Sequence, residues 1–162
     1  MKVANNVPML RVLSLVFPDV EDGDRCTAFS HAPQLRTVAI KGGWIPEIQL
    51  PWMQIKTLEF NRDDFVRPFD WTIIRTFVEI IHSLYSPSIL PNLTSLEFIW
   101  APEHSDWSDA LIAMLHSRVT ASTDAKLLKS VTLGIRNGEE MPSDVVMYMK
   151  ELRAFGVIAS LW

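Results

Sequence analysis

The chain has one cysteine, no excess of positive charge and no long apolar run, and each shortage excludes a class of protein. Cys26 has no second cysteine to pair with, so no disulfide forms within the chain and a reducing compartment is the simpler setting. The net charge of −4 argues against a general nucleic-acid binder, which usually carries a basic stripe. No stretch approaches the roughly 18 apolar residues of a membrane helix. Residues 1–6 lack the apolar segment of a secretory signal, so we expect the protein in the cytosol or the nucleus.

Arrangements of residues that perform catalysis or hold a metal are also missing from the sequence. The four histidines lie far apart, without a second histidine or a cysteine at ligand spacing. The cluster of Glu103, His104, Asp106 and Asp109 fits a polar loop and a helix cap better than a metal site or the centre of a hydrolase. No serine stands in a nucleophile elbow, and no glycine run forms a phosphate-binding loop. We therefore expect neither enzymatic activity nor a cofactor.

Five copies of one short phrase are what the chain does contain. Each copy has an apolar residue at its first, fourth and sixth positions, which is the strand signature of a leucine-rich repeat. A unit of this kind cannot bury its apolar side alone, so neighbouring units must stack. The copies are LRVLSL (10–15), LRTVAI (35–40), IKTLEF (55–60), LTSLEF (93–98) and LKSVTL (128–133).

Apolar residues at helical spacing occupy the longer intervals between the phrases. The first residues of successive phrases lie 25, 20, 38 and 35 positions apart, whereas the usual repeat is about 20 to 29 residues long. The two longer intervals contain periodic apolar stripes over 69–84 and 107–115, with Ser105 and Asp106 as candidate caps of the second. A last helix is predicted from about Ser143 to Ala154, followed by a left-handed stop at Gly156 and a terminal strand over 157–161. Helices packed on a sheet explain these stripes better than helices that bind a membrane or a partner.

These patterns predict an α/β fold, a leucine-rich-repeat solenoid with one curved parallel sheet of five to six strands and helices on its convex side. The apolar fraction of 48% is ordinary for a globular protein, and residues 1–162 are expected to form a single domain. The first strand begins without a polar capping unit ahead of it. Either residues 1–7 are a minimal cap or the chain is the C-terminal part of a longer protein, and we favour the second interpretation.

Five segments are more specific in their order than the repeat phrase is, and together they span nearly the whole chain. They are FSHAPQLRTV (29–38), IQLPW (48–52), LPNLTSL (90–96), MLHSR (114–118) and LKSVTL (128–133). In this order they resemble the C-terminal leucine-rich-repeat region of fungal F-box-like proteins, especially those of basidiomycetes. The resemblance implies that the repeats recruit a substrate for a ubiquitin ligase, while a preceding F-box docks on a Skp1-like adaptor. We expect only the recognition half to carry over, because there is no room for an F-box before Leu10.

Alternate residues of a strand point to opposite sides, which divides each phrase between a core and a concave face. The concave face is expected to be mostly small and polar, with Glu59 and Glu97 as its two negative charges, and it could admit a peptide or a protein loop. Small residues that merely suit a tightly curved inner face are the alternative explanation. The residues expected on this face are Val12, Ser14, Val16, Thr37, Ala39, Lys41, Thr57, Glu59, Asn61, Ser95, Glu97, Ile99, Ser130, Thr132 and Gly134.

Residues directly after the strands are more distinctive, because parallel strands all end at one edge of a sheet. Lys41, Trp44, Arg62, Trp100 and Arg136 should therefore gather along one rim. Tryptophan and arginine are the residue types most often found at interface hot spots, so this rim is the predicted place of partner contact. The alternative is that the tryptophans fold back to cover the ends of the core.

The sequence as a whole predicts a non-catalytic protein-binding module, by resemblance the substrate-recognition part of an F-box-type ubiquitin ligase adaptor. A Skp1-like adaptor is expected as a partner only if an F-box precedes this segment, and neither nucleic acid nor a membrane is expected as a partner. The alternative is a truncated or free-standing leucine-rich-repeat scaffold without any link to a ligase. The predicted partner-binding residues are Lys41, Trp44, Glu59, Arg62, Glu97, Trp100 and Arg136, and no metal or cofactor is expected.

Overall fold

A computed structural model of the chain describes residues 7–17, 29–42, 50–61, 90–100, 107–120, 128–135 and 140–162. Within these residues the chain forms six β-strands, two α-helices and one short 3-10 helix. The apolar stripe predicted to be a helix over 69–84 lies outside the described residues, as do Cys26 and the candidate caps Ser105 and Asp106.

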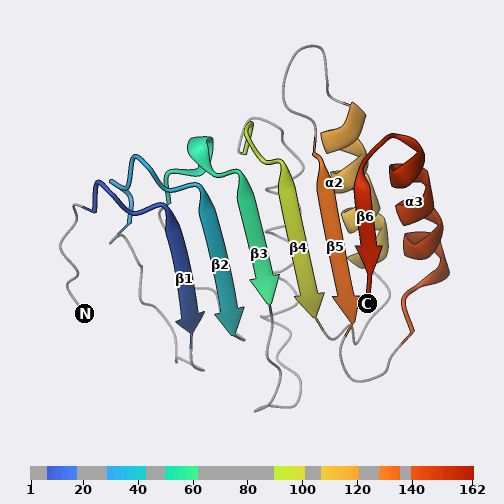
Figure 1. Cartoon of the computed structure of the whole chain (residues 1–162). Helices are drawn as coiled ribbons and strands as arrows, with labels where there is room; N and C mark the ends of the chain where they lie inside the picture. The colour runs from blue at the N-terminus through green and yellow to red at the C-terminus, as the bar shows by residue number, and fades with distance from the viewer. Residues whose placement is uncertain are drawn as a thin grey trace.

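One open sheet contains all six described strands, and every pair of neighbours is parallel (Figure 1). The strands cross the sheet in chain order, so each new strand is added at the same growing edge. This arrangement confirms the predicted α/β class with a single parallel sheet, including the sixth, terminal strand. The strands are β1 (Val12–Phe17), β2 (Thr37–Gly42), β3 (Thr57–Asn61), β4 (Ser95–Trp100), β5 (Ser130–Ile135) and β6 (Ile158–Leu161).

The register of the sheet aligns the five phrases position by position. Leu58 of β3, for example, stands opposite Val38 of β2 and Leu96 of β4, and these residues occupy the fourth position of their phrases. The full row at this position is Leu13, Val38, Leu58, Leu96, Val131 and, in β6, Ala159. All six side chains are buried. The prediction that the phrases are adjacent members of one parallel ladder is therefore confirmed.

The backbone joint between neighbouring strands has the same form at four successive places. The N–H groups of Arg36 and Thr37 both donate to the carbonyl oxygen of Arg11, at 2.9 and 3.1 Å. The same double donation recurs from Lys56 and Thr57 to Arg36, from Thr94 and Ser95 to Lys56, and from Lys129 and Ser130 to Thr94, at distances between 2.8 and 3.1 Å. At the last strand Ile158 donates to the carbonyl of Lys129 at 2.8 Å. The first five units are thus linked by one repeated geometry, and the sixth keeps only the second of the two donors.

A tight turn precedes each of the first four strands, and the phrase pattern did not predict it. In each turn the first apolar residue of the phrase donates its N–H to the carbonyl three residues earlier, as Leu35 does to Ala32 at 3.0 Å and Leu93 to Leu90 at 3.1 Å. Proline occupies the second position in three of the four turns, where its fixed φ suits a type I turn. The turns are Val7 to Leu10, Ala32 to Leu35, Trp52 to Ile55 and Leu90 to Leu93, and the third coincides with the 3-10 helix η1 (Trp52–Gln54). The structural repeat therefore begins three residues before the phrase.

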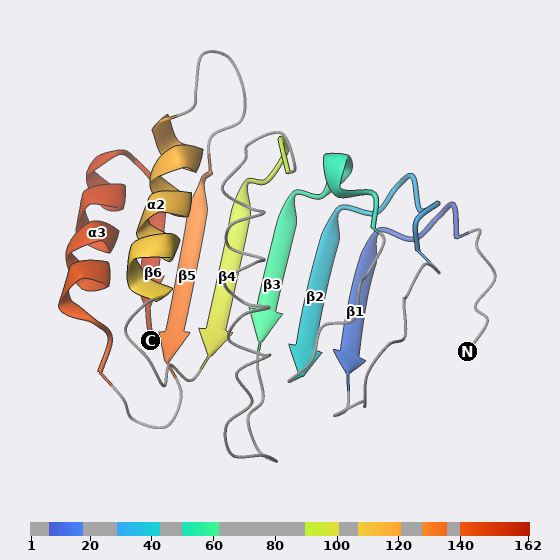
Figure 2. The same ribbon diagram turned by 180° about the vertical axis from the view of Figure 1, so that it is seen from behind.

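Both described helices lie on the same face of the sheet (Figure 2). They are α2 (Trp107–Thr120) and α3 (Ser143–Ala154), so the predicted helices over 107–115 and Ser143 to Ala154 are confirmed. After α3, Gly156 adopts a φ of 82°, and Val157 donates its N–H to the carbonyl of Leu152 at 3.0 Å. This left-handed end, which glycine adopts without a steric penalty, was also expected from the sequence.

The hydrophobic core is one cluster on the side of the sheet that carries these helices, and it includes residues of all six strands. Phe98 of β4 is fully buried and meets Phe60 of β3 edge to face, with ring centroids 5.9 Å apart. The helices contribute buried side chains at helical spacing, which are Leu111, Met114 and Leu115 from α2 and Val145, Met149 and Leu152 from α3. Burial of this apolar area is the main force that holds the strands and helices together.

Polar side chains are also buried in the helix layer, namely Ser108 and Arg118 of α2 and Tyr148 of α3. Arg118 of α2 donates from Nη1 to the carbonyl oxygen of Leu90 at 2.7 Å, and desolvation by burial lowers the pKa of its guanidinium. Tyr148 of α3 lies 6.3 Å from the ring of His116, measured between centroids, and its hydroxyl has no hydrogen-bond partner among the described residues. Burial, with a smaller contribution from Glu151, raises the pKa of Tyr148 to about 12.

Candidate functional site

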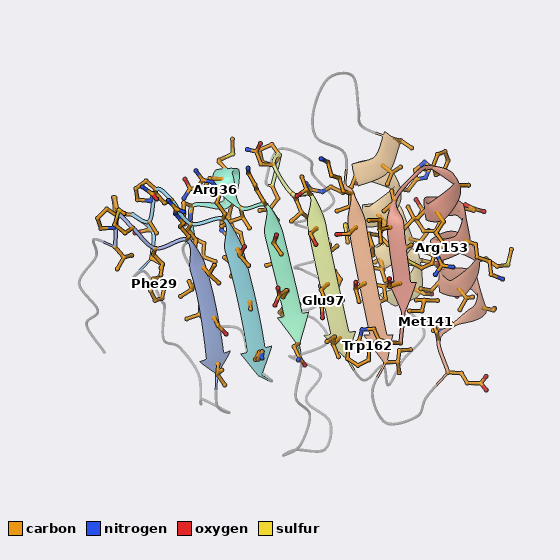
Figure 3. The ribbon with its side chains drawn as sticks, viewed as in Figure 1. Phe29, Arg36, Glu97, Met141, Arg153 and Trp162 are labelled. Carbon is orange, nitrogen blue, oxygen red and sulfur yellow. The ribbon has the colours of Figure 1, made fainter. Side chains whose placement is uncertain are left out.

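The face of the sheet opposite α2 and α3 carries no described helix, and we call it the open face (Figure 3). Its side chains alternate along each strand with those of the core, and they include the exposed residues Val12, Val16 and Ile158, which are 60%, 69% and 69% exposed. The residues that the sequence assigned to a concave face all stand at these alternate positions in β1 to β5. The division of the phrases between two faces is therefore as predicted.

Parallel register arranges the open face in three bands that run across the strands. The first band is mostly hydroxylic, and the hydroxyl groups of Ser95 and Ser130 lie 2.8 Å apart within it. The second band carries the two carboxylates, and the third carries an ammonium and an amide. The bands are Val12, Thr37, Thr57, Ser95, Ser130 and Ile158; then Ser14, Ala39, Glu59, Glu97, Thr132 and Ser160; then Val16, Lys41, Asn61, Ile99 and Gly134.

A depression of about 110 Å³ lies where the second and third bands cross β2, β3 and β4. Its chemistry is mixed, since two carboxylates and an ammonium group stand beside small and apolar side chains. On the open face the lining residues are Ala39, Lys41, Glu59, Asn61, Glu97 and Ile99. A hollow of this size is about as large as a single amino-acid side chain.

Glu59 and Glu97 are direct partners in the register of β3 and β4, so their carboxylates project side by side from strands about 4.8 Å apart. Both side chains are partly exposed, and Glu97 projects from β4 in Figure 3. Like charges directly opposite each other destabilise a sheet. Within the described part of the chain no ion pair joins either carboxylate to Lys41. The pair therefore offers unused negative charge to a cationic group from outside.

Trp162 extends the third band by one position, next to Gly134, and the sequence did not predict this. Trp162 continues the ladder beyond β6, with its N–H donating to Leu133 at 3.2 Å and its carbonyl accepting from Ile135 at 3.1 Å. Its ring lies over Gly134, where a Cβ atom would stand only 3.0 Å from the indole. The signal in the sequence is a glycine at a position where the neighbouring units carry side chains. The indole of Trp162 thus covers Gly134 at this side of the sheet (Figure 3).

The structure brings three of the seven predicted partner-binding residues together, namely Lys41, Glu59 and Glu97, which line the depression. Lys41 and Trp100 were expected in the loops that follow their strands, and this expectation was wrong. Lys41 lies within β2, and Trp100 is the last residue of β4 and pairs with Ile135. The side chain of Trp100 is outside the described part of the chain. The other three, Trp44, Arg62 and Arg136, also lie outside the described residues, and their grouping along one rim stays a prediction.

The described residues give no support to a metal site, a hydrolase centre or a membrane-spanning helix. No group of three or more histidine, cysteine or carboxylate side chains in them could hold a metal ion. Of the residues considered for a hydrolase, Asp109 is an exposed residue in the first turn of α2, and His104 and Asp106 fall outside the described ranges. Neither α2 nor α3 has the length and apolar character that crossing a bilayer requires.

Comparison of the chain with protein-family models, curated proteins and solved structures found no match.

Proposed function

We propose that the chain is a non-catalytic protein-binding module of the leucine-rich-repeat type, and that the open face holds a protein partner. The repeated turn, strand and backbone joint support the repeat assignment, because a solenoid is built from units that contact only their neighbours. In this proposal the sheet is curved, and the open face is its concave side.

The single observation that carries the proposal is the unpaired charge in the depression. Glu59 and Glu97 stand side by side without a counter-ion in the described part of the chain, on a face of the sheet that carries no described helix. A partner that inserts a lysine or arginine side chain there would relieve the repulsion and form charge-assisted hydrogen bonds. Lys41 at the edge of the depression would donate a hydrogen bond to an acceptor group of the partner and so orient it.

By resemblance to fungal F-box-like proteins, the partner would be a substrate presented for ubiquitination. A Skp1-like adaptor joins the complex only in a form of the protein that includes an F-box. A free-standing scaffold would use the same face without that adaptor, and the cytosol or the nucleus is the setting for either role.

The test is a quantitative pull-down with the tagged protein and the double variant Glu59→Gln, Glu97→Gln. A matched control, Glu140→Gln with Asp144→Asn, removes two exposed carboxylates near the start of α3 and leaves the open face intact. We expect the control to recover the wild-type set of proteins and the open-face variant to lose its main partner by about tenfold or more. Equal recovery by all three proteins would refute the open face as the binding surface.

Co-purification from cells that express a longer form separates the two roles. Recovery of a Skp1-like adaptor together with the partner supports substrate recruitment. Recovery of the partner alone supports the free-standing scaffold.

A further inference from the structure

A row of basic residues follows the amino-terminal end of the sheet, and we define it as the basic ladder: Arg11, Arg36, Lys56 and Lys129. Each is the second residue of its phrase, and Thr94 holds that position in the fourth phrase. The backbone joints connect them in order, because the N–H of Arg36 donates to Arg11 at 2.9 Å and that of Lys56 donates to Arg36 at 2.8 Å. Thr94 and Lys129 continue the series. At about 4.8 Å per strand the ladder is about 19 Å long.

The positive charge of this ladder is not neutralised within the described part of the chain. Arg11 donates from Nε to the side-chain oxygen of Gln34 at 3.3 Å, and Arg36 donates from Nη1 to the carbonyls of Pro33 and Leu35 at 3.1 and 2.9 Å. These acceptors are neutral, and no described carboxylate forms an ion pair with any of the four cations. The side chains of Arg11, Lys56 and Lys129 are exposed, and the four described turns before β1 to β4 contain no aspartate or glutamate.

The turns directly before Arg36, Lys56 and Thr94 are tied to one another by side-chain amides. Gln54 donates to the carbonyl of Ala32, and Asn92 donates to the carbonyl of Met53 at 2.6 Å, so each amide reaches the preceding turn. Figure 3 shows Arg36 at the amino-terminal end of β2, on this row of turns. Cations held on a cross-tied backbone are preorganised, which lowers the entropy lost when a partner binds.

Two of the turns that directly precede these cations also carry an exposed methionine. Met9 is 72% exposed and Met53 is 64% exposed, and an exposed methionine is an adaptable apolar contact. The ladder therefore combines a line of positive charge with two apolar contacts. This is the complement of a peptide in which acidic residues alternate with apolar ones.

We propose that the basic ladder is a second docking surface, which binds an extended segment rich in glutamate and aspartate on a protein partner. Six residues of extended chain span the ladder at about 3.3 Å per residue. Nucleic acid fits the surface less well, because the protein has a net charge of −4 and Glu59 and Glu97 lie about 10 Å along the strands from Lys56 and Thr94. The proposal does not depend on the open face, since the two surfaces share no residue.

The test measures the binding of a fluorescently labelled peptide of six glutamates and two leucines by fluorescence anisotropy at low salt and at physiological salt. We expect saturable binding that weakens as salt rises. The variants Lys56→Gln and Lys129→Gln each weaken binding by about threefold and together by about tenfold. The matched control Lys150→Gln removes an exposed positive charge on α3 and leaves the affinity unchanged.

A variant that adds a positive charge is a further test, because misfolding cannot explain tighter binding. The variant Thr94→Lys places a cation at the one missing position and should tighten peptide binding by about threefold. Thermal unfolding checks that every variant retains the fold.

Three results would overturn the proposal. The first is an absence of saturable peptide binding, and the second is an equal effect of Lys129→Gln and Lys150→Gln, which would reduce the binding to net charge. The third is tighter binding of a single-stranded DNA oligonucleotide of equal charge, which would assign the ladder to nucleic acid. The variant Glu59→Gln, Glu97→Gln should bind the peptide no more weakly than the wild type, so failure of one proposal leaves the other testable.

Discussion

The covered face and the open face of the sheet are built from alternate residues of the same six strands, yet they differ in almost every physical property. The covered face carries buried residues such as Leu58, Leu96 and Phe98, which belong to one hydrophobic cluster with the buried residues of α2 and α3. The open face carries small hydroxyl groups, two carboxylates and one ammonium. A shift of the register by one residue would exchange these two sets, so burial of the covered face fixes the chemistry of the open one. Core residues and open-face residues thereby occupy alternate positions of one short phrase.

The largest expected effect comes from the covered face. Replacement of the buried Phe98 by alanine should lower the free energy of unfolding by about 3–5 kcal/mol, because it leaves a cavity beside Phe60. The matched change on the open face, Thr132→Val, should stay within about 0.5 kcal/mol. Urea unfolding followed by circular dichroism measures both. If Phe98→Ala does not fold, Phe98→Leu should still cost about 1 kcal/mol or more, and equal effects of the core and open-face changes would contradict the comparison.

The second prediction concerns the buried hydroxyl group of Tyr148 in the helix layer. Replacement of Tyr148 by phenylalanine should raise the free energy of unfolding by about 1 kcal/mol, because the buried hydroxyl lacks a hydrogen-bond partner among the described residues. Since the folded pKa of Tyr148, about 12, exceeds the ordinary value of 10.0, the folded state favours the neutral phenol. The resulting stability is complete below about pH 10 and is lost as the pH rises toward 12.

Urea unfolding at neutral and alkaline pH checks this second prediction. The variant Tyr148→Phe should lose less stability than the wild type between pH 10 and pH 12. A variant that is less stable at neutral pH and equally sensitive to alkali would show that the hydroxyl makes a favourable interaction.

The smallest expected effect belongs to the open face and has the opposite sign to a core mutation. The variant Glu59→Gln should raise the free energy of unfolding by about 0.2–1 kcal/mol at low salt, since it removes the repulsion with Glu97. Thermal unfolding at low and high salt measures this gain, which should shrink as salt screens the charges. Glu140→Gln, an exposed carboxylate outside the sheet, is the control. A loss of stability in Glu59→Gln would mean that the two carboxylates do not repel each other.

Much of the fold could be predicted because the apolar spacing within each phrase is enough to predict one strand. The positions of Leu13, Val38 and Leu58 in one row follow from the spacing alone, once stacking is assumed. The end of α3 could be predicted because Gly156 is the residue that adopts a positive φ at low cost. The repeated turn was missed because its four copies share little beyond a proline in three of them, and the third copy is a 3-10 helix.

The candidate site could be predicted only where strand alternation determines it. The neighbouring placement of Glu59 and Glu97 follows from the same position in two adjacent phrases. The position of Trp162 over Gly134 depends on how the chain end crosses the sheet, which no local pattern encodes. The basic ladder was visible as a basic second position in four of the five phrases, but net charge sums over the chain and conceals a local row of cations.

The repeated joint between strands has a consequence for how such a chain changes in length. Four successive junctions use the same pair of donors and one acceptor, so the amino-terminal edge of one strand is interchangeable with that of the next. A whole unit could be duplicated or deleted without any new type of backbone contact at the seam. Gains and losses of this kind would lengthen or shorten both the row of cations and the bands of the open face in equal steps, so the reach of the two surfaces would grow together.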